Sequence, residues 1–209
     1  MNKFEYRGFY QKYDMTGEIE IGKGVVKVHD IFDALPEFMK QADCLFIDPP
    51  CNEGNLKSFY TKADLEKQFS IDAFNNRLFE LIDEINPKSL FIETFKSNNE
   101  VMWHYLLDRG YVIKEFESYY YGASKNKCWI LYASKKDNEF EIPFFDEEKV
   151  IEYICKNLDF DCIGDLCMGK GLVGFYANKY NKKFVGTELN KKRLACLLEH
   201  INENKIIVR

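Results

Sequence analysis

The chain has 209 residues, of which 46% are apolar and 30% are charged, as in ordinary globular proteins. Its net charge of −5 excludes a whole-protein basic field that would hold nucleic acid without sequence preference. No apolar run approaches membrane-spanning length, and the seven cysteines contain no C-x-x-C pair. We therefore expect a cytoplasmic α/β protein with reduced thiols, no membrane contact and no metal site.

The first part of the chain is predicted to form an arm, a strand and a helix. Residues 1–22 carry aromatic side chains between charges, so this arm either folds back over the domain or stacks on bases, and we favour the first. Gly24 to Asp30 is predicted to be a strand. Ile31 to Met39 has helical spacing, with Asp30 as a suitable N-cap.

A short apolar run, 45–47, ends in Asp48-Pro49-Pro50-Cys51, which we name the acceptor lip. A short apolar run that is stopped by proline is typical of a buried strand in a parallel sheet. Proline has no N–H group, so the proline carbonyls and the Asp48 carboxylate form a rigid surface of hydrogen-bond acceptors. Ligands of open α/β sheets bind at the carboxyl ends of strands, so the acceptor lip is a candidate binding site.

The middle of the chain is predicted to alternate helices with strands and to end in a hairpin. The polar residues 52–62 are predicted to form a long loop beside the acceptor lip. The hairpin tip, residues 122–127, carries Lys125 and Lys127, which either contact phosphates or are simply solvated. The other predicted elements are a helix over 71–85, a strand over 89–95, a helix over 101–107, and hairpin strands over 111–121 and 128–134.

The last third of the chain continues the alternation and contains a glycine motif. A predicted buried strand, 160–167, leads into Gly169-x-Gly171-x-x-Gly174 at the start of a helix. Regular alternation of strands and helices predicts a Rossmann-like α/β fold, with a mostly parallel sheet and helices on both faces. The remaining predicted elements are a helix from Asp146 to about 158, a strand over 184–188 and a final helix over 190–204.

The glycine motif predicts a nucleotide site, because Glu188 follows it by about 20 residues at the end of the next strand. The glycine turn lets a ligand approach the backbone, and the carboxylate accepts hydrogen bonds from ribose hydroxyls. A nicotinamide dinucleotide and S-adenosylmethionine both fit this pattern. The motif is followed by one further strand, whereas a dinucleotide domain needs two mononucleotide halves, so S-adenosylmethionine fits better.

Three stretches of the sequence occur in this order: Asp48-Pro49-Pro50, Asp165-Leu-Cys-Met-Gly169-Lys-Gly171, and Phe184-Val-Gly-Thr-Glu188-Leu-Asn190. They resemble the signatures of the amino-group methyltransferases that act on DNA. The order is similar to that of the permuted (β-type) branch, in which the catalytic strand precedes the cofactor-binding strand. The resemblance implies one permuted domain over 23–209 without a separate target-recognition domain. It also implies a seven-stranded sheet with the hairpin of residues 111–134 as its antiparallel edge.

The resemblance further implies roles for particular residues, with S-adenosylmethionine as the cofactor. Asp48 and the carbonyl of Pro49 would accept the two N–H bonds of an exocyclic amine, with Pro50 and Cys51 completing the catalytic lip. Asp30 would lie near the adenine of the cofactor. The implied cofactor-binding residues are Asp30, Asp165, Cys167, Gly169, Gly171, Glu188 and Asn190.

The implied substrate is a nucleic-acid base that flips out to reach the lip, in DNA rather than RNA, with adenine N6 first and cytosine N4 next. Cys51 departs from the family, which has an aromatic residue there to stack on the base. Phe59 or Tyr60 would supply that ring, and Lys125 and Lys127 would assist substrate binding.

Other functions stay open at the level of the sequence. An RNA base or a protein glutamine amide would use the same acceptors, and a cofactor-binding subunit without turnover is the alternative from another class. Because the chain has no long insertion, specificity would have to come from the loop of residues 51–70, the hairpin tip of residues 122–127, the N-terminal arm, or another subunit, either in a homodimer or as a partner.

Overall fold

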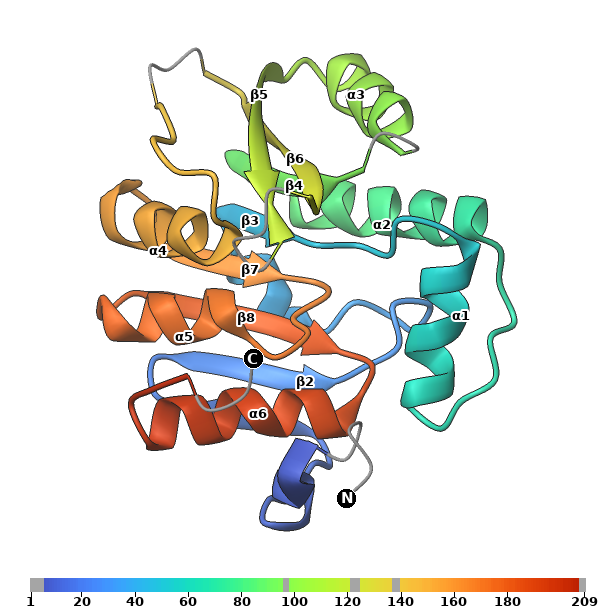
Figure 1. Cartoon of the computed structure of the whole chain (residues 1–209), viewed down its shortest axis with the longest axis vertical. Helices are drawn as coiled ribbons and strands as arrows, with labels where there is room; N and C mark the ends of the chain where they lie inside the picture. Colours follow the sequence, from blue (N-terminus) through green and yellow to red (C-terminus); the bar gives the residue numbers. More distant parts are fainter. Residues whose placement is uncertain (1–5, 96–97, 121–124, 137–139, 207–209) are drawn as a thin grey trace.

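The computed structural model describes residues 6–95, 98–120, 125–136 and 140–206. Within these residues eight strands form one sheet, and the five central strands are parallel (Figure 1). Across the sheet the strands are β1 (Glu18–Ile21), β2 (Gly24–Val28), β8 (Lys183–Glu188), β7 (Cys162–Asp165), β3 (Cys44–Ile47), β4 (Ser89–Thr94), β6 (Lys127–Ser134) and β5 (Val112–Tyr119).

Helices cover both faces of the sheet, as the alternation in the sequence predicts (Figure 1). The α-helices are α1 (Glu53–Lys62), α2 (Ile71–Ile85), α3 (Asn99–Asp108), α4 (Glu147–Asn157), α5 (Leu172–Lys179) and α6 (Lys191–Asn202), and the 3₁₀ helices are η1 (Tyr6–Gln11) and η2 (Glu37–Gln41). Apolar side chains of α1, α2, α3 and η2 form one core cluster, and those of α4, α5 and α6 form the other. The predicted α/β class with a mostly parallel sheet is therefore confirmed.

Strand β3 shows why the sheet lies between two helical layers. All four of its side chains are buried. Leu45 and Ile47 pack in the cluster with α2 and α3, whereas Cys44 and Phe46 pack in the cluster with α4 and α5. A strand that is apolar on both faces is stable only where both faces are covered, which is the situation in a parallel sheet.

The edges of the sheet are antiparallel. The predicted hairpin is formed by β5 and β6, and β6 pairs antiparallel with β4. The resemblance implied seven strands, and the described residues contain eight, because β1 pairs antiparallel with β2 at the opposite edge. Phe9 of η1 is buried against Ala195 and Cys196 of α6, and the Tyr13 hydroxyl donates to Glu199 at 2.6 Å. The described part of the arm thus lies on the domain.

Two predicted elements are wrong. Ile31–Met39 is not a helix: the chain turns after Asp30, and η2 begins only after Pro36, which donates no N–H. Residues 52–62 are not a loop, because 53–62 form α1. The Asn52 side chain caps this helix by accepting a hydrogen bond from the Asn55 N–H at 2.9 Å.

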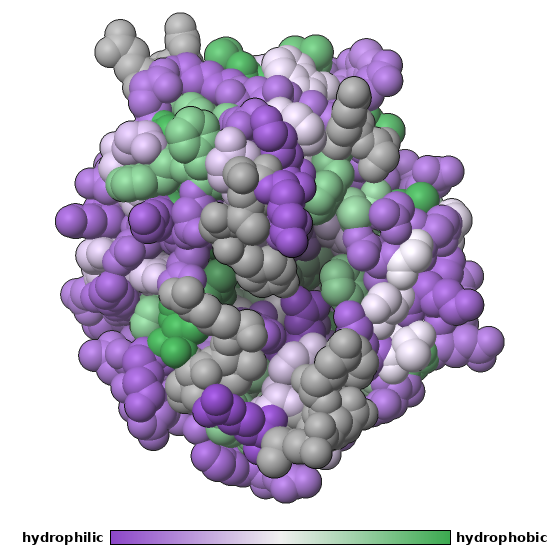
Figure 2. Space-filling view, viewed as in Figure 1, coloured by the Kyte–Doolittle hydropathy of each residue, from purple (hydrophilic) through white to green (hydrophobic). Residues whose placement is uncertain are grey.

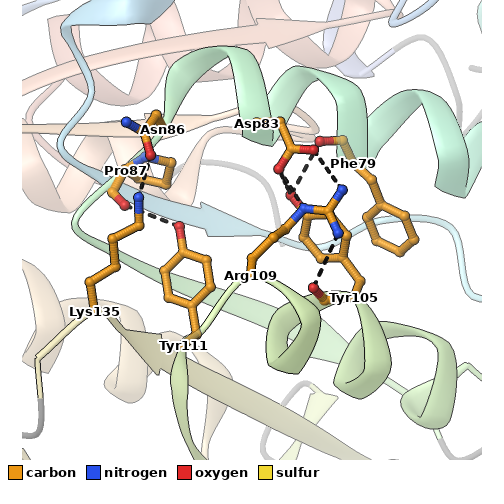
Figure 3. Close-up of polar contacts among 8 residues, drawn as sticks. All are labelled: Phe79, Asp83, Asn86, Pro87, Tyr105, Arg109, Tyr111 and Lys135. Atoms are coloured by element: carbon orange, nitrogen blue, oxygen red, sulfur yellow. Dashed lines mark hydrogen bonds and ion pairs between the residues drawn. The ribbon is translucent and has the colours of Figure 1, made fainter.

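A polar cluster joins α2 to the elements that follow it (Figure 3). Arg109 donates two hydrogen bonds to the Asp83 carboxylate, each 2.6 Å long. The Tyr105 hydroxyl contacts the same carboxylate at 2.9 Å, and the Tyr111 hydroxyl donates to the Pro87 carbonyl at 3.1 Å. Paired charges with two parallel hydrogen bonds are strong, so these contacts fix α3 and β5 relative to α2.

On the face shown in Figure 2, hydrophilic side chains cover most of the surface, and hydrophobic ones form small separate groups. No helix within the described residues has both the length and the apolar character that crossing a membrane requires.

Candidate active site

A cavity of about 600 Å³ opens at the carboxyl ends of β2, β3, β7 and β8. Its position follows from the topology: β3 leads on to β4 on one side, while the adjacent β7 leads to β8 on the other. Ligands of open α/β sheets bind at such a switch point. The predicted site residues that line the cavity are Asp30, Asp48, Pro50, Phe59, Tyr60, Asp165, Cys167, Gly169 and Glu188.

Glu188 ends β8 and is held by backbone donors. Its side chain is buried, and its two carboxylate oxygens accept hydrogen bonds from the N–H groups of Gly169 (2.6 Å) and Asn190 (2.9 Å). The pKa of Glu188 is raised, because the effect of burial exceeds the lowering by the Arg193 charge and by these backbone bonds. A carboxylate oxygen accepts more than one hydrogen bond, so Glu188 can still accept from hydroxyl groups of a ligand.

The glycine turn differs in function at its two ends. Gly169 lines the cavity with a φ of +57°, and a Cβ there would lie 2.7 Å from the Arg193 side chain. Gly171 lies outside the cavity lining and begins α5 with a φ of +79°. A Cβ on Gly171 would lie 2.5 Å from the Cβ of Leu197, so this glycine is required for α5 to approach α6.

Asp165 ends β7 next to the strand that carries Asp48. It is buried, and its Oδ1 accepts a hydrogen bond from the Cys167 N–H at 2.9 Å. Burial is the largest cause that raises the pKa of Asp165 well above its ordinary value, and the Asp48 and Glu188 charges raise it further. A further anion beside Asp165 would raise this pKa again, whereas a cationic group would lower it.

Asp30 and the two aromatic residues of α1 form another part of the wall. The Tyr60 hydroxyl donates to the Asp30 carboxylate at 2.9 Å, and the Tyr60 side chain is only 4% exposed. Tyr60 thus has little open ring surface on which a base could stack. Phe59 is half-buried, and its ring centroid lies 5.1 Å from the guanidinium carbon of Arg193.

At the acceptor lip, Asp48 and Pro50 line the cavity, whereas Pro49 and Cys51 do not. The Cys51 thiol donates to the Asn55 side chain at 2.5 Å, and burial raises its pKa, so it is a neutral thiol at the start of α1. Asn190 also lies outside the lining.

The two tip lysines are not at the cavity either. Lys125 is exposed, and Lys127 forms an ion pair with Glu117 at 3.1 Å. Residues 121–124 of the predicted tip lie outside the described residues.

Tyr120 is the aromatic residue at the lip that the sequence did not reveal. It follows β5, lines the cavity and donates a hydrogen bond from its hydroxyl to Asp48 Oδ1 at 2.7 Å. Its ring stacks on Phe95, with the centroids 5.2 Å apart and the planes at 10°. The hydrogen bond holds one oxygen of Asp48 and lowers its pKa, which opposes the effect of burial.

Two further carboxyl groups lie beside Asp48. Oxygens of Asp48, Glu93 and Glu147 all lie within 4.8 Å of one another, and we name these three residues the carboxyl cluster. Glu93 is 1% exposed, and its Oε1 accepts a hydrogen bond from the Cys128 thiol at 2.8 Å. Its Oε2 has no hydrogen-bond partner among the described residues. Carboxyl groups this close either share protons or surround a cation.

Burial and mutual repulsion disfavour full ionisation of the carboxyl cluster near neutral pH. Burial is the largest cause that raises the pKa of all three groups, to about 8 for Glu147 and well above the ordinary value for Glu93. The Asp48 charge raises the pKa of both glutamates. Asp48 itself is stabilised in its ionised form by the Tyr120 hydroxyl and by Arg193. It is therefore the member best able to stay negative.

Comparison with known proteins finds similarity to solved structures but not to sequences. No protein-family model matches the chain, and no curated protein is similar to it in sequence. The M1.HpyAVI–SAM complex matches with a TM-score of 0.59 and 15% identity over 85% of this chain and 98% of that chain. The cytosine-N4-specific PvuII DNA methyltransferase matches with a TM-score of 0.58 and 11% identity over 88% of each chain.

The chain has a methyltransferase fold. A third solved structure, TTHA0409 from Thermus thermophilus, matches with a TM-score of 0.56 and 13% identity over 78% of this chain and 87% of that one. At identities this low, the structural matches establish the fold alone, and this fold agrees with the predicted fold class.

Proposed function

We propose that the chain is an S-adenosylmethionine-dependent methyltransferase that modifies an exocyclic amine of a nucleic-acid base, with adenine N6 in DNA first and cytosine N4 next. The observation that carries the proposal is the single cavity that joins Asp48 to Asp165 and Glu188. One carboxylate lies where an amine can be held, and the others lie where a nucleoside cofactor can be held. Solved structures of DNA methyltransferases with the same fold support this assignment.

The residues around the cavity fit S-adenosylmethionine. Among the described residues that line the cavity, eight are carboxylic acids and three are lysine or arginine. This balance suits a sulfonium cation and disfavours the pyrophosphate of a dinucleotide. Glu188 would accept from the ribose hydroxyls, Asp30 and Tyr60 would border the adenine, and Asp165 would lie at the methionine end. The volume is also in the usual range for a cofactor pocket of about 300–1,000 Å³.

The bound cofactor supplies an electrophilic methyl group, and the protein's task is to position the amine. The lone pair of a base amine is delocalised into the ring, so it attacks only when the nitrogen is held in line and becomes tetrahedral. The Asp48 carboxylate, which lines the cavity, accepts one N–H of the amine. The resemblance assigns the second N–H to the Pro49 carbonyl, although Pro49 lies outside the lining. Tyr120 fixes Asp48 by a 2.7 Å hydrogen bond and favours its ionised form against the effect of burial, so that the acceptor faces the positive charge that develops on nitrogen.

Binding and turnover are tested separately. Thermal shift assays with S-adenosylmethionine and with NAD identify the cofactor: we expect stabilisation by the first and none by the second, because ligands that bind the native state raise Tm. Isotope-labelled S-adenosylmethionine is then incubated with separate DNA and RNA pools. The proposal predicts label in DNA that Asp48→Ala abolishes. Label in RNA alone would change the substrate, and a cofactor-binding protein that labels neither pool would be a subunit without turnover.

A further inference from the structure

We propose that Glu147 donates a hydrogen bond to the acceptor atom next to the substrate amine, so that Asp48 and Glu147 together select an amine flanked by a ring nitrogen. This inference rests on the proposed function and adds a specificity-determining residue to it. Adenine and cytosine both carry a ring nitrogen acceptor beside the exocyclic amine. An ionised acid beside a protonated one presents the complementary pattern, an acceptor next to a donor.

The position of Glu147 is set by contacts outside its own helix. It lies in the first turn of α4 and lines the same cavity as Asp48. The segment before it is tied to the end of β5: the Tyr119 N–H donates to the Phe145 carbonyl at 2.6 Å, and the Ser118 hydroxyl donates to the same carbonyl at 3.0 Å. These bonds bring α4 over the acceptor lip, so that a carboxyl oxygen of Glu147 lies within 4.8 Å of one from Asp48.

The surroundings of Glu147 favour its protonated form. Acidic groups face it from several elements, and burial adds to their effect. The helix N-terminus favours the ionised form, but that effect is small beside burial among other carboxyls. The titratable groups around Glu147 are Asp48 at the end of β3, Glu93 on β4, Tyr120 after β5, Cys128 on β6, and Asp146 and Glu148 on either side of it.

Glu93 explains why a second proton stays in the carboxyl cluster. Its side chain is 1% exposed, one of its oxygens accepts from Cys128, and the other has no partner among the described residues. An ionised, unpartnered carboxylate is costly in such a place, so Glu93 holds a proton. Two protonated glutamates beside one ionised aspartate leave Asp48 as the acceptor and Glu147, which reaches the cavity, as the donor.

The test compares natural bases with analogues that lack the ring nitrogen. Oligonucleotide pools contain adenine or 1-deazaadenine, and, in the cytosine arm, cytosine or 3-deazacytosine. We expect the wild type to prefer the natural base by roughly tenfold or more in kcat/KM, as base-edge hydrogen bonds do elsewhere. Glu147→Ala is expected to lower kcat/KM on the natural base and to remove the preference. Glu147→Gln keeps an N–H donor and is expected to retain most of the preference.

The pH profile gives a second readout that a purely structural residue would not alter. The wild-type kcat/KM is expected to fall as pH rises through about 8, when Glu147 loses its proton. Glu147→Gln is expected to lack this fall, because its amide donates at any pH. Glu141→Gln is the matched control: this glutamate is exposed and pairs with Lys114, and its variant is expected to behave as wild type.

Four results would overturn the proposal. An unchanged preference for the natural base in Glu147→Ala, in a protein that still transfers methyl groups, would remove the role of Glu147 and leave the proposed function intact. Persistence of the alkaline fall in Glu147→Gln would do the same. Stabilisation by Mn²⁺ that Glu93→Gln abolishes would make the carboxyl cluster a cation site. Failure of the wild type to label any pool would refute both the proposed function and the role of Glu147.

Discussion

Replacing Tyr120 by Phe removes one hydroxyl group from the candidate active-site cavity and leaves the ring on Phe95. The hydroxyl donates to Asp48 Oδ1 at 2.7 Å. A hydrogen bond to a charged group contributes about 1.5–3 kcal/mol. If Tyr120→Phe forfeits this in the transition state, kcat/KM for the base should fall roughly 10- to 100-fold, since about 1.36 kcal/mol is tenfold in rate. The KM for S-adenosylmethionine should change little, because Tyr120 contacts Asp48 rather than Glu188.

The same substitution should shift the acidic limb of the rate profile. The Tyr120 hydrogen bond lowers the pKa of Asp48, so its loss raises that pKa, and activity that needs ionised Asp48 should begin at a higher pH. Initial rates with labelled cofactor across pH measure both effects. Tyr119→Phe is the control, because the Tyr119 hydroxyl donates to Glu117 and not to Asp48. A Tyr120→Phe enzyme with wild-type kcat/KM and an unmoved acidic limb would refute the assigned role.

Three other substitutions test the frame of the site. Glu188→Gln should place an amide NH₂ against a backbone N–H such as that of Gly169, which loses a hydrogen bond at a cost of about 1–3 kcal/mol. The rise in Tm that S-adenosylmethionine causes should therefore be smaller than in wild type, and an unchanged rise would contradict this. Gly171→Ala should lose about 2–5 kcal/mol in urea unfolding through the positive φ and the clash with Leu197, and a loss below about 0.5 kcal/mol would be inconsistent with this packing. Glu93 carries a raised pKa, so the folded state keeps a proton that the unfolded state releases, and the free energy of unfolding should fall as pH rises above the ordinary pKa of a glutamate. Glu93→Gln should flatten this fall between pH 5 and 8. Equal slopes of unfolding free energy against pH in wild type and variant would argue against a protonated Glu93.

Elements with strong local determinants could be predicted from the sequence. The helix predicted over 71–85 has the bounds of α2, because apolar residues recur at helical spacing between the Ser70 cap and Asn86-Pro87. The buried strands β3 and β4 were predicted because their apolar runs are too short to form a helix of ordinary length.

Elements whose signals are weak or mixed were missed. The apolar residues of helix α1 are only Leu56, Phe59 and Tyr60, which is too short a stripe to predict a helix among polar residues, and its start depends on a single Asn52 cap. The segment 31–39 has apolar residues at helical spacing, but Pro36 lies in its middle. There the missing N–H outweighs the periodicity, and the chain forms a turn and a short 3₁₀ helix.

The residues of the candidate site also divide into those that the sequence predicted and those that it did not. Residues at the ends of parallel strands, such as Asp48, Asp165 and Glu188, could be placed at one edge of the sheet from the order of elements alone. Tyr120 and Glu147 could not, because they reach Asp48 through the pairing of β5 with β6 and through the segment before α4. Glu93 did leave a signal: it is a charged residue in an otherwise apolar buried strand, and such residues are rarely buried without a function.

The central claim is that Asp48 holds an exocyclic base amine for methylation. It is tested most directly by identifying the nucleoside that receives the labelled methyl group. DNA treated with the protein and labelled S-adenosylmethionine is digested and separated alongside authentic methylated nucleosides. The proposed mechanism predicts label in N6-methyladenine or N4-methylcytosine, and none with Asp48→Ala. Label on a ring carbon such as cytosine C5, or label that persists in Asp48→Ala, would contradict it.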